Sequence, residues 1–378
     1  MKKIVFLTGT RADYGKIKSL LKVLSNSKKF EVYIYVTGMH MLSKYGNTYI
    51  EILKDGFTNV YLEKNILETD KMDIALSDSI KKFSNYIDIV KPDLIVVHGD
   101  RIEAFAGAIV GAFNNIRIAH IEGGEISGTI DESTRHAISK FAQFHFVANE
   151  EAKNRLIQMG ENRKNIYVIG SPDIDIMLSD ELPTLEMVKE KYDIKFDKYA
   201  IVMYHPVTTE ISKIEENVNN LVSFLENSIK NYIIIYPNND LGSNIILNAY
   251  KKLDHKENIR IFPSIRFEMF LTLLKNCDFV IGNSSAGIRE CGVYGIPAIN
   301  IGTRQTGRFN IFENKNIINI ENTLLGIDKI LHDIDKYRVK CFSFGKGTSC
   351  ENFIKILETE SFWNIEIQKK FNDLNRFD

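Results

Sequence analysis

The 378-residue sequence has few cysteines, and they are not arranged for a metal site or a disulfide framework. The four cysteines are scattered without a C-x-x-C pair, which argues against zinc and fits a reducing compartment. Lys and Arg total 48 against 49 Asp and Glu, so no overall basic field would attract nucleic acid. We therefore expect no bound metal, no nucleic-acid partner and a cytoplasmic location.

The sequence also lacks long apolar runs. No stretch approaches the roughly 18 residues that a membrane-spanning helix needs. The first apolar run, residues 4–7, is followed by polar TGTR before it could form the core of a signal peptide, so it indicates a first strand. We expect a soluble globular protein with no membrane partner, and the chain length predicts two or three domains.

Short runs rich in Val and Ile alternate with helical patterns, which is typical of βαβ units in a parallel sheet. Apolar residues three or four apart predict helices that include residues 17–24, 80–90 and 214–225. The expected strands are residues 4–7, 32–36, 94–97, 117–121 and 167–169, and then residues 200–204, 232–236, 260–262, 279–281 and 298–301.

A charged, irregular stretch at residues 179–198 separates the two strand series, with the hinge expected near residues 172–195. The sequence thus predicts an α/β protein with two Rossmann-like domains that face each other across a cleft. We place these domains at residues 1–175 and 176–357. Residues 358–378 are expected to form a helix that packs back on the first domain.

Polar segments follow three predicted strands of the first domain, where open α/β sheets bind ligands. After the first strand, Arg11 and Lys16 would add positive charge for an anion at a helix N-terminus. This loop lacks G-x-G-x-x-G and G-K-[ST], so neither a nicotinamide site nor a Walker loop is supported. A surface turn with solvated charges is the alternative.

Carboxylates follow the other two strands. Asp100, in the segment HGDR, points to the cleft or serves as the N-cap of a helix over residues 102–112. Beyond the next strand, carboxylates around a Gly-Gly turn could act as general acids and bases once their pKa values differ. These are Glu122, Glu125, Asp131 and Glu132. For Glu125, Glu132 and the nearby His136, a solvated surface role is the alternative.

Two segments of the second domain could also take part in catalysis or ligand binding. His205 follows the first strand of that domain and could transfer a proton, although a lone histidine is more often structural. Ser284 and Ser285 precede a helix, where hydroxyls and backbone N–H groups can hold phosphate, and Glu290 suits a ribose diol. An ordinary serine N-cap is the alternative for this segment.

Together these segments resemble the hydrolysing UDP-N-acetylglucosamine 2-epimerases of sialic acid biosynthesis. The similarity runs from Lys3 to about Arg308 and implies a glycosyltransferase-B-like fold. The segments that carry it are GTRADY at 9–14, HGDR at 98–101, HIEGGEISGT at 120–129, HPVTT at 205–209, GNSS at 282–285 and GTRQ at 302–305. HPVTT stands where non-hydrolysing relatives carry an arginine-rich segment, which favours the hydrolysing branch.

The resemblance implies that UDP leaves by anti elimination across C1 and C2, and that the resulting 2-acetamidoglucal is hydrated. UDP-sugar and UDP would be the ligands, without a cofactor, and the protein would be a homodimer or homotetramer. The implied catalytic residues are Asp100, Glu122, Asp131 and His205. The implied substrate-binding residues are Arg11, Asp13, Lys16, His40, Arg101, Arg135, Asn239, Ser284, Ser285, Glu290 and Arg304.

Three alternatives stay open. The same chemistry could act on UDP-2,4-diacetamido-2,4,6-trideoxyglucose, also named UDP-N,N'-diacetylbacillosamine, for legionaminic acid. A glycosyltransferase of the same fold would also bind a nucleotide sugar, but a retaining transferase has no need of the first-domain carboxylates. A non-catalytic UDP-sugar sensor would not need titratable groups gathered at one pocket. Glu132 departs from the aspartate frequent in relatives, so it is given no proton-transfer role.

Overall fold

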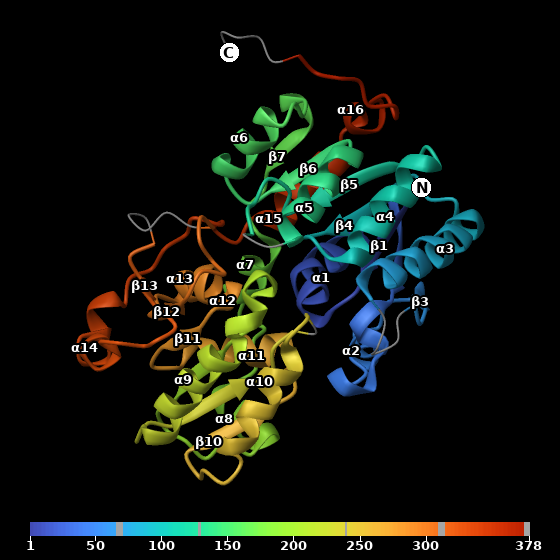
Figure 1. Cartoon of the computed structure of the whole chain (residues 1–378). Coiled ribbons are helices and arrows are strands. Elements are labelled where there is room, and N and C mark those ends of the chain that lie inside the picture. The colour runs from blue at the N-terminus through green and yellow to red at the C-terminus, as the bar shows by residue number, and fades with distance from the viewer. Residues whose placement is uncertain (66–70, 128–129, 239, 309–313, 374–378) are drawn as a thin grey trace. The chain divides into compact units, whose positions relative to one another are not determined.

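Figure 1 shows the computed structural model, which describes residues 1–65, 71–127, 130–238, 240–308 and 314–373. The chain forms two compact units. The first comprises Met1–Glu125, Ile130–Leu178 and the chain from Phe344 onward. The second comprises Ser179–Ser343 and a short segment that begins at Ile126.

The first unit is built on a parallel sheet with the strand order β3-β2-β1-β4-β5-β6-β7. Its strands are β1 (Lys2–Thr8), β2 (Phe30–Val36), β3 (Val60–Leu62), β4 (Leu94–His98), β5 (Arg117–Ile121), β6 (Phe144–Val147) and β7 (Ile166–Val168). Its helices are α1 (Arg11–Ser25), α2 (Tyr49–Lys54), α3 (Met72–Val90), α4 (Ile102–Phe113), α5 (Ile130–Phe141), α6 (Glu150–Gln158), α7 (Pro172–Met177), α15 (Ser349–Leu357) and α16 (Glu360–Trp363).

The second unit repeats this plan, with the parallel strand order β10-β9-β8-β11-β12-β13. Its strands are β8 (Ala200–Met203), β9 (Tyr232–Ile235), β10 (Ile259–Phe262), β11 (Val280–Gly282), β12 (Ala298–Ile301) and β13 (Ile317–Ile320). Its helices are α8 (Leu185–Tyr192), α9 (Ile214–Asn227), α10 (Ser243–Tyr250), α11 (Phe267–Lys275), α12 (Ser285–Ile288), α13 (Glu290–Tyr294) and α14 (Ile327–His332).

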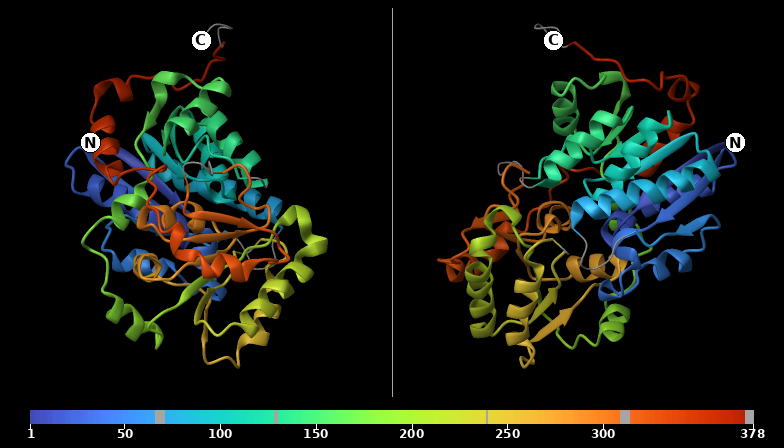
Figure 2. Two further views of the ribbon diagram at one scale, coloured as in Figure 1. Left: turned by 90° about the vertical axis from the view of Figure 1, so that its left-hand side faces the viewer. Right: turned by 45° about the vertical axis from the view of Figure 1, so that its right-hand side comes forward.

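The strands are apolar on both faces because helices cover both faces of each sheet (Figures 1 and 2). In β1, Ile4 and Phe6 pack with α1, whereas Val5 and Leu7 pack with α3 and α4. Each sheet reverses its strand order once, between β1 and β4 and between β8 and β11. In open α/β sheets, ligands generally bind at the carboxyl ends of the strands beside such a reversal. The predicted fold class, α/β with two Rossmann-like domains, is confirmed.

The ten predicted strands are all present, with ends that shift by up to two residues. Strands β3, β6 and β13 were not predicted from the sequence. The irregular stretch predicted at residues 179–198 contains the helix α8, which Thr184 caps by accepting a hydrogen bond from the Met187 N–H.

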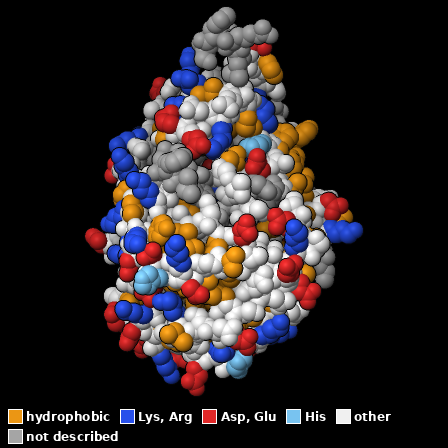
Figure 3. All heavy atoms as spheres, turned by 60° about the vertical axis from the view of Figure 1, so that its left-hand side comes forward, with side chains coloured by type: hydrophobic (Ala, Val, Ile, Leu, Met, Phe, Trp, Pro, Cys, Tyr) orange, Lys and Arg blue, Asp and Glu red, His pale blue; other side chains and the backbone are white. Residues whose placement is uncertain are grey.

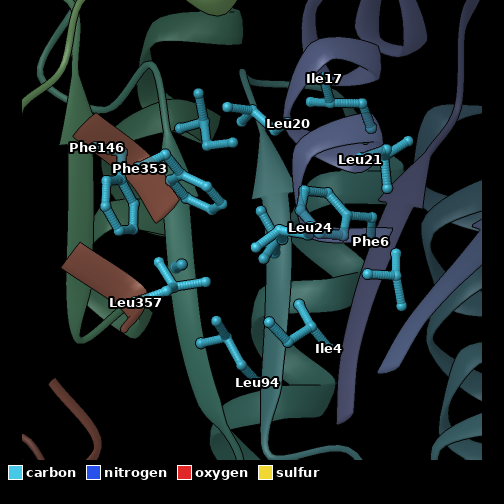
Figure 4. Close-up of a cluster of buried hydrophobic side chains, with 14 of the residues drawn as sticks. Ile4, Phe6, Ile17, Leu20, Leu21, Leu24, Leu94, Phe146, Phe353 and Leu357 are labelled. Atoms are coloured by element: carbon cyan, nitrogen blue, oxygen red, sulfur yellow. The ribbon is translucent and has the colours of Figure 1, made fainter. Parts of the chain in front are cut away.

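The C-terminal part of the chain belongs to the first compact unit. The chain joins the first unit at Phe344, not at residue 358, because α15 packs on α1 and α7. Figure 4 shows Phe353 and Leu357 of α15 in the buried cluster with Leu20 of α1. The predicted helix over residues 358–378 corresponds to the short α16, and residues 364–373 are not helical.

Charged side chains of both signs are interspersed over the face of the molecule in Figure 3, as the formal net charge of −1 would suggest. Across the part of the chain that the structure describes, no helix is both long and apolar enough to cross a membrane.

Replacing Phe353 with Ala should destabilise the first unit by about 3–5 kcal/mol, the usual cost of removing a buried aromatic side chain. The Phe353 ring is fully buried and packs edge-on against Phe146, with 4.6 Å between ring centroids. Denaturant unfolding would measure the change. Lys355→Ala on the exposed face of the same helix is the matched control. A loss below about 1 kcal/mol would contradict the packing described here.

Candidate active site

The first-unit site forms where three adjacent strands end. Strands β1, β4 and β5 pair side by side, so the loops that follow them lie at one edge of the sheet. The β1 loop leads into α1 through a capping box, in which Asp13 Oδ2 accepts from the Thr10 N–H at 3.1 Å. The capping box fixes the glycine-containing turn, which was predicted from the sequence to lie at a ligand site.

Glu122 lies at the centre of this edge. Its side chain is only 6% exposed, and its Oε1 lies 3.0 Å from Lys16 Nζ and 3.3 Å from His98 Nε2. These two cations stabilise the ionised carboxylate. The Glu122 backbone has a φ of +64°, an uncommon left-handed conformation for a non-glycine residue, and such strain is concentrated at functional sites.

Gly124 explains why the turn after β5 needs glycine. Its φ is +75°, and a Cβ at this position would lie 2.1 Å from the Ala152 carbonyl oxygen. No other residue type would fit this close approach of two backbone segments. The Gly-Gly turn therefore fixes the path of the chain immediately after Glu122.

His98, the last residue of β4, is a site residue that the sequence did not single out. Its Nε2 faces Glu122, and its Nδ1 lies 3.8 Å from Asp13 Oδ1. Burial lowers the pKa of His98, but the nearby carboxylates of Glu122 and Asp13 outweigh it and raise the pKa to about 9. His98 is therefore an imidazolium at neutral pH. Its position at the end of a predicted strand could have identified it as a site residue from the sequence.

Arg135 of α5 connects the loops after β4 and β5. Its buried guanidinium pairs with the Asp100 carboxylate, and its Nη1 donates to the Glu122 carbonyl oxygen at 2.7 Å. Asp100 does not cap α4, because Arg101 occupies the N-cap position, so that alternative is wrong. Asp131 lies one helical turn before Arg135, on the same face of α5.

Three other predicted residues of the first unit have contacts outside this cluster. Arg11 Nη2 donates to Glu51 Oε1 at 2.5 Å, and Arg101 lies 3.9 Å from the Met39 sulfur. Both ring nitrogens of His40 are hydrogen-bonded, to Thr8 Oγ1 at 3.1 Å and to Thr48 Oγ1 at 2.6 Å. Burial lowers the pKa of His40 to about 4, so the ring is neutral.

The remaining charged residues near this turn differ in exposure. Glu125 is buried, whereas Glu132 is half-exposed and lies 3.8 Å from His136, one turn along the surface of α5. The surface role considered for Glu132 and His136 thus agrees with their positions.

The second-unit site is organised by Asn283, directly after β11. Its side chain accepts from the His205 N–H at 2.7 Å and donates to the His205 carbonyl at 2.9 Å. The preceding Gly282 has a φ of +142°, and a Cβ there would lie 2.0 Å from the Met203 carbonyl oxygen. These contacts hold the loops after β8 and β11 together.

His205 is neutral and has a defined tautomer. Burial, together with the charge of Arg304, lowers its pKa to about 3. Its Nδ1 accepts from the Asn238 N–H at 3.0 Å, which leaves the proton on Nε2. The ring can therefore donate a hydrogen bond from Nε2, for example to an anionic oxygen.

The other predicted residues of the second unit surround the same loop. Arg304 Nη1 donates to the Asn283 carbonyl at 3.2 Å. Ser284 caps α12 by accepting from the Ala286 N–H at 3.3 Å, so the N-cap considered for this serine is confirmed. Ser285 begins α12, and the buried Glu290 begins α13. Asn239 lies outside the described residues.

Among the side chains that the structure describes, no group of three or more His, Cys, Asp or Glu residues could hold a metal ion. The chemistry available at the two sites is that of carboxylates, imidazoles and fixed cations, which can transfer protons and stabilise an anionic leaving group.

The fold and these two sites define an α/β protein of the glycosyltransferase-B-like type. The sequence profile described as UDP-N-acetylglucosamine 2-epimerase matches residues 22–358, so the chain belongs to the UDP-N-acetylglucosamine 2-epimerase family. The resemblance seen in the sequence is confirmed.

Two curated relatives match nearly the whole chain. A UDP-N-acetylglucosamine 2-epimerase of Neisseria meningitidis serogroup B is 45% identical over 99% of this chain and 100% of its own length. A hydrolysing UDP-N,N'-diacetylbacillosamine 2-epimerase of Legionella pneumophila is 33% identical over 95% of this chain and 96% of its own.

The fold also matches solved structures. The crystal structure of Methanocaldococcus jannaschii UDP-GlcNAc 2-epimerase in complex with UDP-GlcNAc and UDP gives a TM-score of 0.81 at 23% identity. The match covers 94% of this chain and 99% of that one. This likeness supports the fold of the protein.

The charge state of His98 can be tested by titration. The folded-state pKa of about 9 exceeds the value of about 6.5 expected in the unfolded chain. The stabilisation by charged His98 should therefore be complete below about pH 6.5 and lost as the pH rises through about 9. NMR of the imidazole signals, assigned with His98→Asn, would measure the midpoint. A midpoint at or below 6.5 would show that the ion pairs described here do not hold the proton.

Proposed function

We propose that the protein is a hydrolysing UDP-N-acetylglucosamine 2-epimerase that converts UDP-N-acetylglucosamine and water into N-acetylmannosamine and UDP, for sialic acid biosynthesis. The single observation that carries the catalytic assignment is the buried Glu122 carboxylate between Lys16 and His98. The HPVTT segment and the hydrolysing relative in Legionella support the hydrolysing branch. The sialic acid destination rests on the sequence resemblance.

In the proposed reaction a carboxylate removes the C2 proton while the C1–O bond breaks and UDP leaves with the electron pair. Water then adds to the 2-acetamidoglucal, and its oxygen bonds to C1. A solvent proton adds to C2 on the face opposite the one from which the original proton was removed, which inverts C2. We assign proton transfer to the carboxylates Asp100, Glu122 and Asp131, and we assign to His205 a hydrogen bond from Nε2 to an oxygen of the leaving group. Lys16 and Arg135 add positive charge where negative charge develops.

We assign the nucleotide chiefly to the second unit. Ser284, Ser285 and Arg304 surround the Asn283 loop and would bind the diphosphate, while the buried Glu290 would accept from the ribose hydroxyls. From the first unit, the resemblance adds Arg11, Asp13, His40 and Arg101, and from the second Asn239. Arg11 would have to exchange its bond to Glu51 for a ligand contact.

The alternative substrate is UDP-N,N'-diacetylbacillosamine, for legionaminic acid. It is favoured by the 33% identity to the Legionella enzyme, whereas the 45% identity to the Neisseria enzyme favours UDP-N-acetylglucosamine. The two sugars differ at C4 and C6, where a few pocket side chains can discriminate between them.

The homodimer or homotetramer expected from the resemblance stays a prediction, which analytical ultracentrifugation would decide.

The proposed reaction can be tested by incubating the purified protein with each UDP-sugar in D₂O and following UDP release. We expect kcat/KM to be at least about tenfold higher for UDP-N-acetylglucosamine, a difference that a few pocket contacts can supply. The product should be free N-acetylmannosamine with deuterium at C2. Release of an intact UDP-sugar epimer would indicate a non-hydrolysing enzyme, and hydrogen at C2 would exclude the glycal route.

Replacing Glu122 with Gln should lower kcat by roughly two to four orders of magnitude, the usual loss when a general acid or base is removed. The side-chain shape is retained, so UDP should still bind, and calorimetry would measure this. Glu132→Gln, at a half-exposed residue of α5 that is given no proton-transfer role, is the matched control and should behave like wild type. Wild-type turnover in Glu122→Gln would show that the Glu122 carboxylate takes no part in the mechanism.

A further inference from the structure

The C-terminal tail, residues 364–373, is fastened to the first unit at the start of β5. Arg117 Nη2 donates to the carbonyl of Trp363 at 2.7 Å, just before the tail, and Gln143 Nε2 donates to that of Ile367 at 2.7 Å. Gln143 Oε1 also accepts from the backbone N–H of Ile118, in β5, at 2.8 Å. The tail therefore contacts the beginning of the strand whose far end leads into Glu122.

Lys369 binds the C-terminal end of α5. Its Nζ donates to the Ser139 carbonyl at 3.1 Å and to the Ala142 carbonyl at 2.8 Å. The last carbonyls of a helix lack intrahelical partners and carry partial negative charge, so an ammonium group stabilises them. Helix α5 has 12 residues and is about 18 Å long. Its first turn carries Asp131, and Arg135 lies in its middle.

The position of Lys369 is fixed by a buried carboxylate. Lys369 also pairs with Glu161, whose side chain is only 2% exposed. Burial raises the pKa of Glu161, but contacts with His145, Lys369 and Lys140 outweigh it and lower the pKa to about 2. Glu161 is thus ionised, and it holds the ammonium group against the end of the helix.

A buried chain of hydrogen bonds leads from this helix end to Asp100. Ser139 Oγ is hydrogen-bonded to His120 Nδ1 at 2.9 Å, and His120 Nε2 is hydrogen-bonded to the Gly99 carbonyl oxygen at 2.8 Å. Burial lowers the pKa of His120 to about 3, so the ring is neutral. Because a carbonyl can only accept, Nε2 carries the proton and Nδ1 accepts from the Ser139 hydroxyl. Gly99 directly precedes Asp100, which pairs with Arg135.

We propose that Lys369 is a positioning residue for the active site, acting through α5. By binding the helix end and Glu161 it fixes the axial position of α5, and with it Arg135 against Asp100 and Glu122. The Ser139–His120–Gly99 chain gives the same lysine a second connection to the Asp100 loop. This role rests on the proposed function only in that Asp100, Glu122 and Asp131 perform the chemistry.

The test compares Lys369→Met with Lys370→Met. Lys370 is the neighbouring lysine, is 74% exposed, and pairs with Glu366 on the surface of the tail. For Lys369→Met we expect kcat for UDP-N-acetylglucosamine to fall about tenfold with KM changed less than about twofold, a size typical of coupling through a contiguous network. Hydrogen exchange of α5 amides should become about tenfold faster, while that of β1 and β4 stays unchanged. Lys370→Met should match wild type in both measurements.

Unchanged kcat and unchanged α5 exchange in Lys369→Met would overturn the proposal. Equal acceleration of exchange in α5, β1 and β4 would also overturn it, because the lysine would then stabilise the whole unit. If Lys369→Met did not fold, Lys369→Arg would replace it, since a planar guanidinium cannot reproduce three contacts of a compact ammonium group. Wild-type values for this variant would equally contradict the proposal. Absence of UDP release by the wild type would refute the proposed function alone, because α5 exchange needs no substrate.

Discussion

The first-unit site depends on a buried carboxylate surrounded by cations. Glu122 is removed from water at a large cost in desolvation, which only nearby positive charge can offset. Lys16 comes from α1, His98 from β4 and Arg135 from α5. Loss of any one would leave the buried charge less well compensated, so the positions of three elements are coupled to one side chain. The strained Glu122 backbone, with a φ of +64°, persists because these contacts over-determine it.

Helix α5 is the element through which this constraint extends into the rest of the unit. Its N-terminal turn presents Asp131, and Arg135 bonds both the Asp100 carboxylate and the Glu122 backbone. Near the C-terminal end of α5, the Ser139 hydroxyl forms a hydrogen bond with His120 of β5. A site supported by a helix keeps its geometry better than one supported by loops alone.

The sequence allowed much of the fold to be predicted, because strands buried on both faces are runs of Val and Ile. The unpredicted β3 and β13 lie at the edges of their sheets and are only partly buried, so their apolar signal is weak. The candidate site was predicted wherever a polar residue follows a strand, as with Asp100 and Glu122. Which groups pair could not be predicted, because Arg135 and Asp100 are 35 residues apart and meet only in the folded chain. The return of the chain at Phe344 likewise depends on tertiary packing of α15.

His98 and His205 show how surroundings, and not residue type, determine chemistry. Both lie at the carboxyl end of a strand beside a switch point, although only His205 was predicted as a site residue from the sequence. Two carboxylates lie close to His98 and raise its pKa to about 9, whereas desolvation and the charge of Arg304 lower the pKa of His205 to about 3. The first is therefore a fixed cation that holds an anionic side chain. The second is a neutral imidazole whose Nε2–H can donate a hydrogen bond to an anionic ligand oxygen but is not acidic enough to be transferred.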